Sequence, residues 1–316
     1  MWKTFIRPAM IFIPFLLGAL FPQAHVLGGA PFNLIRWCLV TMVFMSCLQI
    51  KWSSLRPRRE HWMILGMNLL MGIVPYFVIR RLWPENPVLA NAAFFVGITP
   101  TATAAPVVVA FLNGRIGFAL TGFTITNVFV SLSLLFLLPV VTGEYSVDFI
   151  GRVAVTLLQV IALPFALSLV VRRIWPGAAE WPKRCKTFSF SLWSFTLFVL
   201  AAIARQHFID NPDESHLQIV LIATVSLILC AGNFYFGRIM ASRRFCRESS
   251  QILGQKNTTF TMYLALNFCG ALAAMGPIFY ILWHNTWNAW QMYSYDRRRR
   301  IRAARLKEKA GTHNEL

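Results

Sequence analysis

Apolar residues form long, unbroken stretches along the whole chain, and short polar segments separate them. Ten such stretches lie roughly at residues 8–24, 32–50, 62–82, 88–112, 116–141, 148–172, 187–205, 217–240, 247–270 and 273–292. A helix needs about 20 residues to cross the hydrocarbon layer of a membrane. Continuous rather than alternating runs favour helices over the strands of a barrel. The pattern therefore predicts an all-α polytopic membrane protein with ten transmembrane helices.

Composition agrees with a membrane location. Hydrophobic residues make up 57% of the chain and charged residues only 13%, whereas a soluble domain carries about 25% charged residues. The first stretch follows Lys3 and Arg7 and has the layout of a signal peptide. We interpret it as a retained first helix, because the distribution of charge requires it.

Positive charges predict the orientation of these helices. With ten spans, 24 of the 30 Lys and Arg residues fall on one side, five fall on the other, and the last is Lys256. Lys and Arg accumulate in cytoplasmic loops, so we expect both termini in the cytoplasm and a bacterial inner membrane. Topology thus accounts for the net charge of +18. We expect no nucleic-acid partner, and contact with membrane lipid through the basic tail remains open.

The six cysteines stand singly, without a CxxC pair. This spacing predicts neither a metal centre nor a disulfide framework. Nucleotide-binding fingerprints are also missing from the sequence. We therefore expect no cofactor.

Two of the predicted helices contain polar breaks. The fourth carries Thr99-Pro100-Thr101-Ala102-Thr103-Ala104-Ala105-Pro106, and the ninth carries Gly254-Gln255-Lys256-Asn257-Thr258-Thr259. Proline removes a backbone donor and disturbs the preceding turn. Non-helical backbone at membrane depth survives only inside protein or beside a wet cavity. Both segments are therefore predicted to leave the helix and recover it.

The two breaks lie five helices apart, which indicates an internal repeat. Five is an odd number, so two five-helix halves would have opposite orientations in the membrane. The predicted units are residues 1–146, residues 147–292 and a basic cytoplasmic tail at 293–316. Broken helices at matching positions of inverted halves point to the substrate site of a secondary transporter. Two unrelated helix kinks are the alternative interpretation.

At both breaks the chain resembles the bile acid/sodium symporter family, which belongs to a superfamily that includes arsenite exporters. Pro100, Thr103 and Ala104 match the family's Pro-Gly-Gly-Thr-Ala-Ser-Asn, and Gly254 and Asn257 match its Glu-x-Gly-x-Gln-Asn. A later segment, "GPIFYILWHNTW" with His284 and Asn285, also looks like the family's last helix. The resemblance implies ten helices in inverted repeats, with discontinuous helices four and nine crossing at mid-membrane.

The chain departs from the family at the positions that hold sodium there. The family's Ser and Asn are replaced by Ala105 and Pro106, and its Glu and Gln by Ile252 and Lys256. Sodium, like other hard cations, prefers several oxygen ligands. We therefore expect transport without the two sodium ions. The remaining candidates for ion coupling, to Na⁺ or to H⁺, are Lys256, Gln255, Thr124 and Asn127, with further oxygens at Thr121 and Thr126.

A lysine inside a membrane span indicates a function, and three interpretations of Lys256 stay open. Its charge replaces that of sodium and attracts an anion, or the lysine loses and regains a proton during transport. In the third interpretation it reaches a membrane surface and is inert.

The predicted substrate is a small organic anion with an apolar body. Half-helix N-termini attract anions, and we expect Phe94, Phe95, Phe260 and Met262 to provide apolar surroundings. The candidate substrate-binding residues are Thr101, Thr103, Pro106, Gln255, Lys256, Asn257 and Thr258.

Other functions are less consistent with the sequence. An enzyme is not expected, because His284 is the one histidine inside a predicted span and has no carboxylate near it in sequence. Arsenite export would need a thiol or acid at the breaks, and neither break contains one. A sodium-coupled symporter of bile-acid-like anions and a channel or receptor remain as alternatives. Monomer and homodimer are both compatible with the sequence.

Overall fold

The computed structural model describes residues 13–29, 33–50, 53, 55–212 and 216–313. Some residues on which the predictions rest lie outside these described residues. They are Lys3, Arg7, the start of the first predicted span (8–12), the first residue of the second (32) and the end of the tail (314–316).

The described chain is all-helical, as predicted, and its strand-like pairing is confined to an isolated bridge considered below. Residues 13–20 are helical and lead into the 3-10 turn η1 (Pro22–Leu27). The α-helices that follow are α2 (Leu34–Leu48), α3 (Arg59–Leu82), α4 (Pro87–Ile98), α5 (Ala104–Phe111), α6 (Ile116–Thr142), α7 (Val147–Leu157), α8 (Leu163–Ile174), α9 (Trp181–Arg184), α10 (Lys186–Asp210), α11 (His216–Ile239), α12 (Cys246–Gly254), α13 (Thr258–Phe268) and α14 (Ala271–His313).

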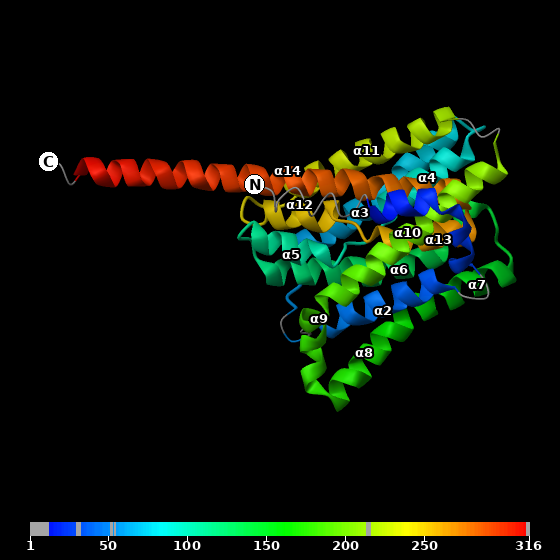
Figure 1. Ribbon diagram of the computed structural model, residues 1–316, viewed down its shortest axis with the longest axis horizontal. Helices are drawn as coiled ribbons and strands as arrows, with labels where there is room; N and C mark the ends of the chain where they lie inside the picture. Colours follow the sequence, from blue (N-terminus) through cyan, green and yellow to red (C-terminus); the bar gives the residue numbers. More distant parts are fainter. Residues whose placement is uncertain (1–12, 30–32, 51–52, 54, 213–215, 314–316) are drawn as a thin grey trace.

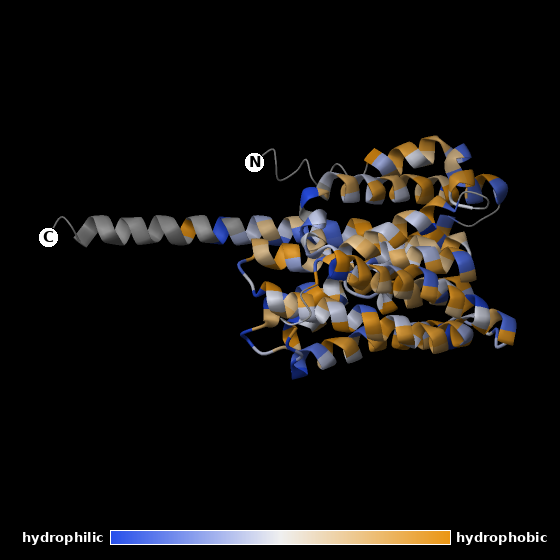
Figure 2. Ribbon diagram, turned by 90° about the horizontal axis from the view of Figure 1, so that it is seen from below, coloured by the Kyte–Doolittle hydropathy of each residue, from blue (hydrophilic) through white to orange (hydrophobic). Residues whose placement is uncertain are grey.

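Five helical segments of the described chain are long and apolar enough to cross a membrane. They are Arg59–Leu82, Ile116–Thr142, Val147–Ile174, Thr187–Asp210 and His216–Ile239. Two shorter apolar helices, α2 and α4, accompany them. Figure 2 shows apolar residues along the helices and hydrophilic residues gathered toward their ends. These lengths and compositions indicate an integral membrane protein, and the total of ten spans stays a prediction.

The segment Val147–Ile174 contains a change of helical pitch. Between α7 and α8 the chain forms one π-helical turn, η3 (Leu158–Ala162). Pro164 follows in the first turn of α8. Proline has no N–H to donate to the preceding turn, and a local π turn can satisfy the backbone groups that this leaves free.

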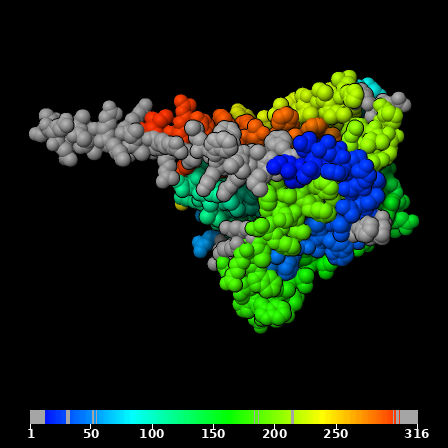
Figure 3. Space-filling model, viewed as in Figure 1, coloured from blue at the N-terminus to red at the C-terminus, as the bar shows by residue number. Residues whose placement is uncertain are grey.

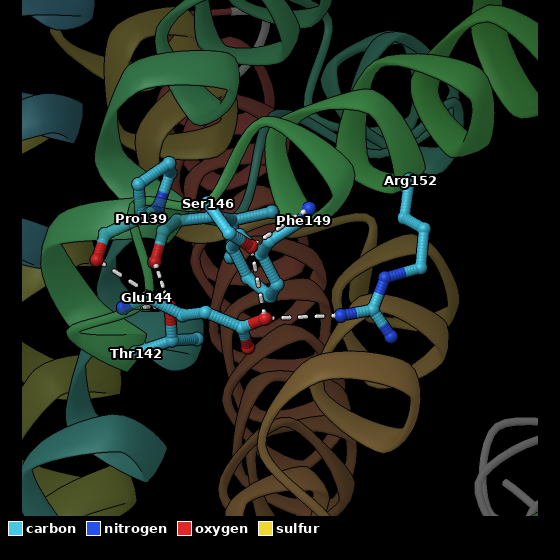
Figure 4. Close-up of polar contacts among 7 residues, drawn as sticks. Pro139, Thr142, Glu144, Ser146, Phe149 and Arg152 are labelled. Atoms are coloured by element: carbon cyan, nitrogen blue, oxygen red, sulfur yellow. Dashed lines mark hydrogen bonds and ion pairs between the residues drawn. The ribbon is translucent and has the colours of Figure 1, made fainter.

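A tight turn joins α6 to α7 at the boundary of the two predicted halves (Figure 4). Gly143 ends α6 with a φ of 73°, a left-handed conformation that glycine adopts without steric strain. The Ser146 hydroxyl accepts a hydrogen bond from the Phe149 N–H and so caps α7. Glu144 and Arg152 form an ion pair of 3.1 Å across the turn.

Helices α3 and α4 approach unusually closely, and Gly97 makes this possible. A β-carbon at Gly97 would lie 1.8 Å from the Met71 carbonyl oxygen. The approach brings Asn68 of α3 to the C-terminal end of α4, where its Nδ2 donates to the Ile98 carbonyl oxygen. This contact positions part of the site described below.

The last helix extends well beyond the helical body. It runs without a break from Ala271 to His313 and projects from the body in Figure 1. The predicted tail at 293–316 is thus a continuation of the tenth predicted span as far as His313. In Figure 3 the chain's first described residues lie against α10, where Gly28 approaches Val199 and Ile203.

Candidate functional site

Both predicted helix interruptions are present. The first separates α4 from α5 at residues 99–103, and the second separates α12 from α13 at residues 255–257. Pro106 was predicted to lie in the first interruption, but it lies in the first turn of α5. The N–H groups of a first turn have no helical partner, so proline is tolerated there.

The two interruptions pair with each other. Thr101 and Lys256 form an antiparallel bridge. The Ala102 N–H donates to the Gln255 carbonyl oxygen and the Asn257 N–H to the Pro100 carbonyl oxygen, each at 2.8 Å. Backbone that leaves a helix inside a protein must find other partners, and here each broken helix supplies them to the other.

We call this pairing of residues 100–102 with residues 255–257 the crossing. Thr101 connects the crossing to α12 and α6. Its fully buried hydroxyl donates to the Ile252 carbonyl oxygen at 2.6 Å, and it accepts from the Thr126 hydroxyl at 2.8 Å. The Asn127 Nδ2 donates to the Thr101 carbonyl oxygen at 2.8 Å. Thr101 and Asn127 therefore hold the crossing together. Thr124 bonds within its own helix, to the Leu120 carbonyl oxygen at 2.9 Å.

We expect Thr101→Val to destabilise the protein by about 1–3 kcal/mol, because two buried partners lose their hydrogen bonds while side-chain shape is kept. Thermal unfolding in detergent measures the change. Thr224→Val is the matched control, since the exposed Thr224 bonds only to its own helix, at the Val220 carbonyl oxygen. Equal unfolding temperatures for the two variants would contradict the role given to Thr101.

The Lys256 side chain lies at the C-terminal end of α4. Its Nζ donates to the Asn68 Oδ1 and, at 3.1 Å, to the Gly97 carbonyl oxygen. Lys256 is 1% exposed. The only ion pair within 4.0 Å among the described residues joins Arg152 to Glu144, so no carboxylate pairs with Lys256. A charged Lys256 would instead be stabilised by the negative end of the α4 helix dipole.

The C-terminal end of α12 is also covered by protein donors. The Tyr280 hydroxyl donates to the Gly254 carbonyl oxygen at 2.8 Å, and Thr101 covers the Ile252 carbonyl oxygen. Half-helix C-termini are places where transporters bind cations. In this chain an ammonium, an amide and two hydroxyl groups occupy the corresponding positions.

A cavity of about 620 Å³ lies beside the crossing. Small-molecule sites usually have volumes of about 300–1,000 Å³. The predicted site residues in its wall are Thr103, Gln255, Lys256, Asn257 and Thr258. Thr101, Pro106, Thr124 and Asn127 are not part of the wall.

Two helix N-termini contribute to the cavity wall. The wall includes Thr103 and Ala104 at the start of α5, and Asn257 and Thr258 at the start of α13. Neither N-cap residue makes a side-chain hydrogen bond that caps its helix. Each N-terminus therefore presents backbone donors and partial positive charge to the cavity.

The apolar part of the wall differs from the prediction. Phe94, Phe95, Phe260 and Met262 are almost fully buried in the protein core and do not contribute to it. Instead α2 and α10 supply the apolar residues, among them Leu39, Met42, Val43, Phe190 and Trp193. Both helices are far in sequence from the two interruptions, so residue spacing did not indicate that they line the cavity.

Residues of α14 complete the cavity. His284 and Asn285, which were not among the predicted site residues, belong to its wall. His284 is 5% exposed, and its Nδ1 has no hydrogen-bond partner in the described structure. Gln255 is held from the same helix, because the Asn288 Nδ2 donates to its Oε1. A polar ligand would find an unpaired ring nitrogen here.

The described residues contain no group of three His, Cys, Asp or Glu side chains that could hold a metal ion. No protein-family model matches the chain. No curated protein matches its sequence either.

Proposed function

We propose that this protein is a secondary transporter of a small organic anion that works by alternating access and without the family's two sodium ions. The protein would be a divergent relative of the bile acid/sodium symporters. Its substrate would bind in the cavity beside the crossing, with Lys256 supplying fixed positive charge.

The position of the Lys256 ammonium carries the proposal. It lies at the C-terminal end of an interrupted helix, where Asn68 and Gly97 offer oxygens of the kind a cation needs. A second cation close by would be repelled by about 4 kcal/mol at 4 Å. The interpretation in which Lys256 reaches a membrane surface is disfavoured by its burial.

The cavity supports an anionic substrate. Two uncapped helix N-termini line it, and helix N-termini favour anions. His284 and Asn257 add polar groups, and α2 and α10 add an apolar wall. A carboxylate or sulfonate attached to an apolar body matches this combination.

The order of helices supports two inverted five-helix repeats and ten spans. The helix at 13–20, α2, α3, α4–α5 and α6 would form the first half. The second half would consist of α7–α8, α10, α11, α12–α13 and α14. In each half the interrupted helix is the fourth. With both termini in the cytoplasm of a bacterial cell, the pairing at residues 101 and 256 would lie near the middle of the inner membrane.

Uptake by proteoliposomes tests the proposal. We expect radiolabelled cholate or pyruvate to accumulate equally with an inward sodium gradient and with choline in place of sodium. An increase of about tenfold or more with sodium, equivalent to about 1.4 kcal/mol of coupling, would contradict it. A matched pH gradient distinguishes proton coupling from fixed charge.

Binding measurements separate transport from other functions. We expect both anions to raise the unfolding temperature of the purified protein independently of sodium. Stabilisation without uptake would favour a receptor. Uptake that rises without saturation as substrate concentration increases, and that substrate on the opposite side does not accelerate, would favour a channel.

A further inference from the structure

Three arginines from separate elements surround one aromatic ring, away from the cavity. The Cζ atoms of Arg58, Arg115 and Arg244 lie 5.4, 5.1 and 5.4 Å from the centroid of the Phe245 ring. All three side chains belong to exposed residues, whereas Phe245 is 4% exposed. Topology explains positive charge on one side of a membrane, but it does not explain convergence on a single ring.

Stacking fixes the ring at the centre of this group, which we call the arginine cluster. The Phe245 ring stacks on Phe118, with centroids 4.3 Å apart and an interplanar angle of 10°. The three guanidinium groups therefore gather around a ring whose position is fixed. Cation–π contacts hold each group in place by about 0.5–1 kcal/mol at such exposed sites.

Helix ends add to the positive potential. Arg58 is the N-cap residue of α3, Arg115 that of α6, and Phe245 that of α12. Three helix N-termini therefore meet at the arginine cluster, and each carries partial positive charge.

Nearby carboxylates of the described chain contact backbone and hydroxyl donors and do not pair with the three guanidinium groups. Glu248 accepts a hydrogen bond from the Arg115 backbone N–H at 2.8 Å, and Glu60 accepts one from the Ser242 hydroxyl. Neither forms an ion pair with the three guanidinium groups within 4.0 Å in the described structure. Guanidinium groups bind phosphate through paired hydrogen bonds, so a phosphate fits three guanidinium groups that have no carboxylate partner among the described residues.

An exposed apolar seam begins beside the cluster. Trp62 lies one turn after Arg58, is 47% exposed, and contacts Phe129 of α6 with ring centroids 5.2 Å apart. The seam continues along α3 and α6 through exposed residues that follow helical spacing, namely Leu70, Phe77, Leu132 and Phe136. Positive charge above an apolar seam with an aromatic residue between them is the arrangement of a lipid contact.

We propose that the arginine cluster and the seam bind an anionic phospholipid. Its phosphate lies among Arg58, Arg115 and Arg244, and an acyl chain follows Trp62 and Phe129. The site is separate from the substrate cavity and does not depend on the proposed transport function.

Lipid retention by the full chain tests this site. The purified protein is incubated with phosphatidylglycerol or phosphatidylcholine, and bound lipid is counted by native mass spectrometry while thermal unfolding is followed. We expect phosphatidylglycerol to bind preferentially, and the combined change Arg58→Gln, Arg115→Gln and Arg244→Gln to weaken its binding by about tenfold or more. The matched control changes three exposed arginines outside the cluster to glutamine: Arg173, Arg184 and Arg238.

Defined outcomes would overturn the proposal. Equal phosphatidylglycerol binding in the cluster variant and the wild type would do so, and so would an equal loss in the control. Stabilisation by inorganic phosphate alone, to the same extent as by phosphatidylglycerol, would show a soluble anion site instead of a lipid site. If the combined variant fails to fold, Arg244→Gln alone decides, because Arg244 precedes α12 outside any helix. We expect a loss of binding there of about severalfold, and unchanged binding would refute the site.

Discussion

Replacing Lys256 with glutamine is expected to reduce sodium-independent anion uptake by about 100-fold or more, a change of about 2.7 kcal/mol. The ammonium makes two buried hydrogen bonds at the end of α4. Hydrogen bonds to charged groups contribute about 1.5–3 kcal/mol each. A neutral amide replaces at most part of this and removes the charge next to the crossing.

The same variant should acquire a response to sodium. Glutamine adds a carbonyl oxygen where Asn68 and Gly97 already present oxygens, and a hard cation prefers such ligands. We expect sodium to raise the unfolding temperature of Lys256→Gln and to leave the wild type unchanged. Thermal unfolding in sodium and in choline measures this difference.

Arg238→Gln is a suitable control for Lys256→Gln. It also removes one positive charge, but Arg238 is exposed near the end of α11. Uptake by this control should match the wild type. Unchanged uptake and unchanged sodium response in Lys256→Gln would remove the basis of the proposed mechanism.

Gly97→Ala is expected to have the largest effect on folding. The added methyl group would lie 1.8 Å from the Met71 carbonyl oxygen and 2.6 Å from the Gly72 nitrogen. Both are backbone atoms, so a rotamer change cannot relieve the clash. Overpacking of a core costs about 1–3 kcal/mol and sometimes more, and we expect the upper end of this range. The Gly97 carbonyl oxygen would also move relative to the Lys256 Nζ.

Gly66→Ala controls for the change from glycine to alanine within a helix. Gly66 lies in α3, and a β-carbon there would meet no atom within 4 Å. Alanine favours a helix by about 1 kcal/mol over glycine, so this variant should be as stable as the wild type or more so. If Gly97→Ala unfolds at the same temperature as Gly66→Ala, the close approach of α3 and α4 is not required.

Hydropathy located the helices well. A helix satisfies its backbone hydrogen bonds internally, so an apolar sequence of sufficient length is the main requirement for a span. The ends of α3 and α11 fall within three residues of the predicted spans 62–82 and 217–240. The polar breaks were equally visible, since amides, hydroxyl groups and a lysine gather there within otherwise apolar stretches. The unwound segments proved shorter than the breaks in the sequence, because Pro106 and Thr258 fit within first helical turns.

Roles within the breaks could not be read from the sequence. Thr101 and Thr103 are two residues apart with the same side chain, yet one binds the crossing and the other faces the cavity. The course of the non-helical backbone decides which way each threonine side chain points. Such backbone has no regular period from which that direction could be predicted. The apolar wall from α2 and α10 likewise depends on how distant helices pack.

The sequence by itself determined that the chain is helical, that several helices are long and apolar enough for a membrane, and that two are interrupted. These properties follow from local hydrogen bonding and from hydrophobicity averaged over about 20 residues. Only the tertiary structure decided that the interruptions pair, that Lys256 reaches Asn68, and that Arg58, Arg115 and Arg244 meet at Phe245. The reason is physical: these contacts join residues far apart in sequence, and packing between helices brings them together.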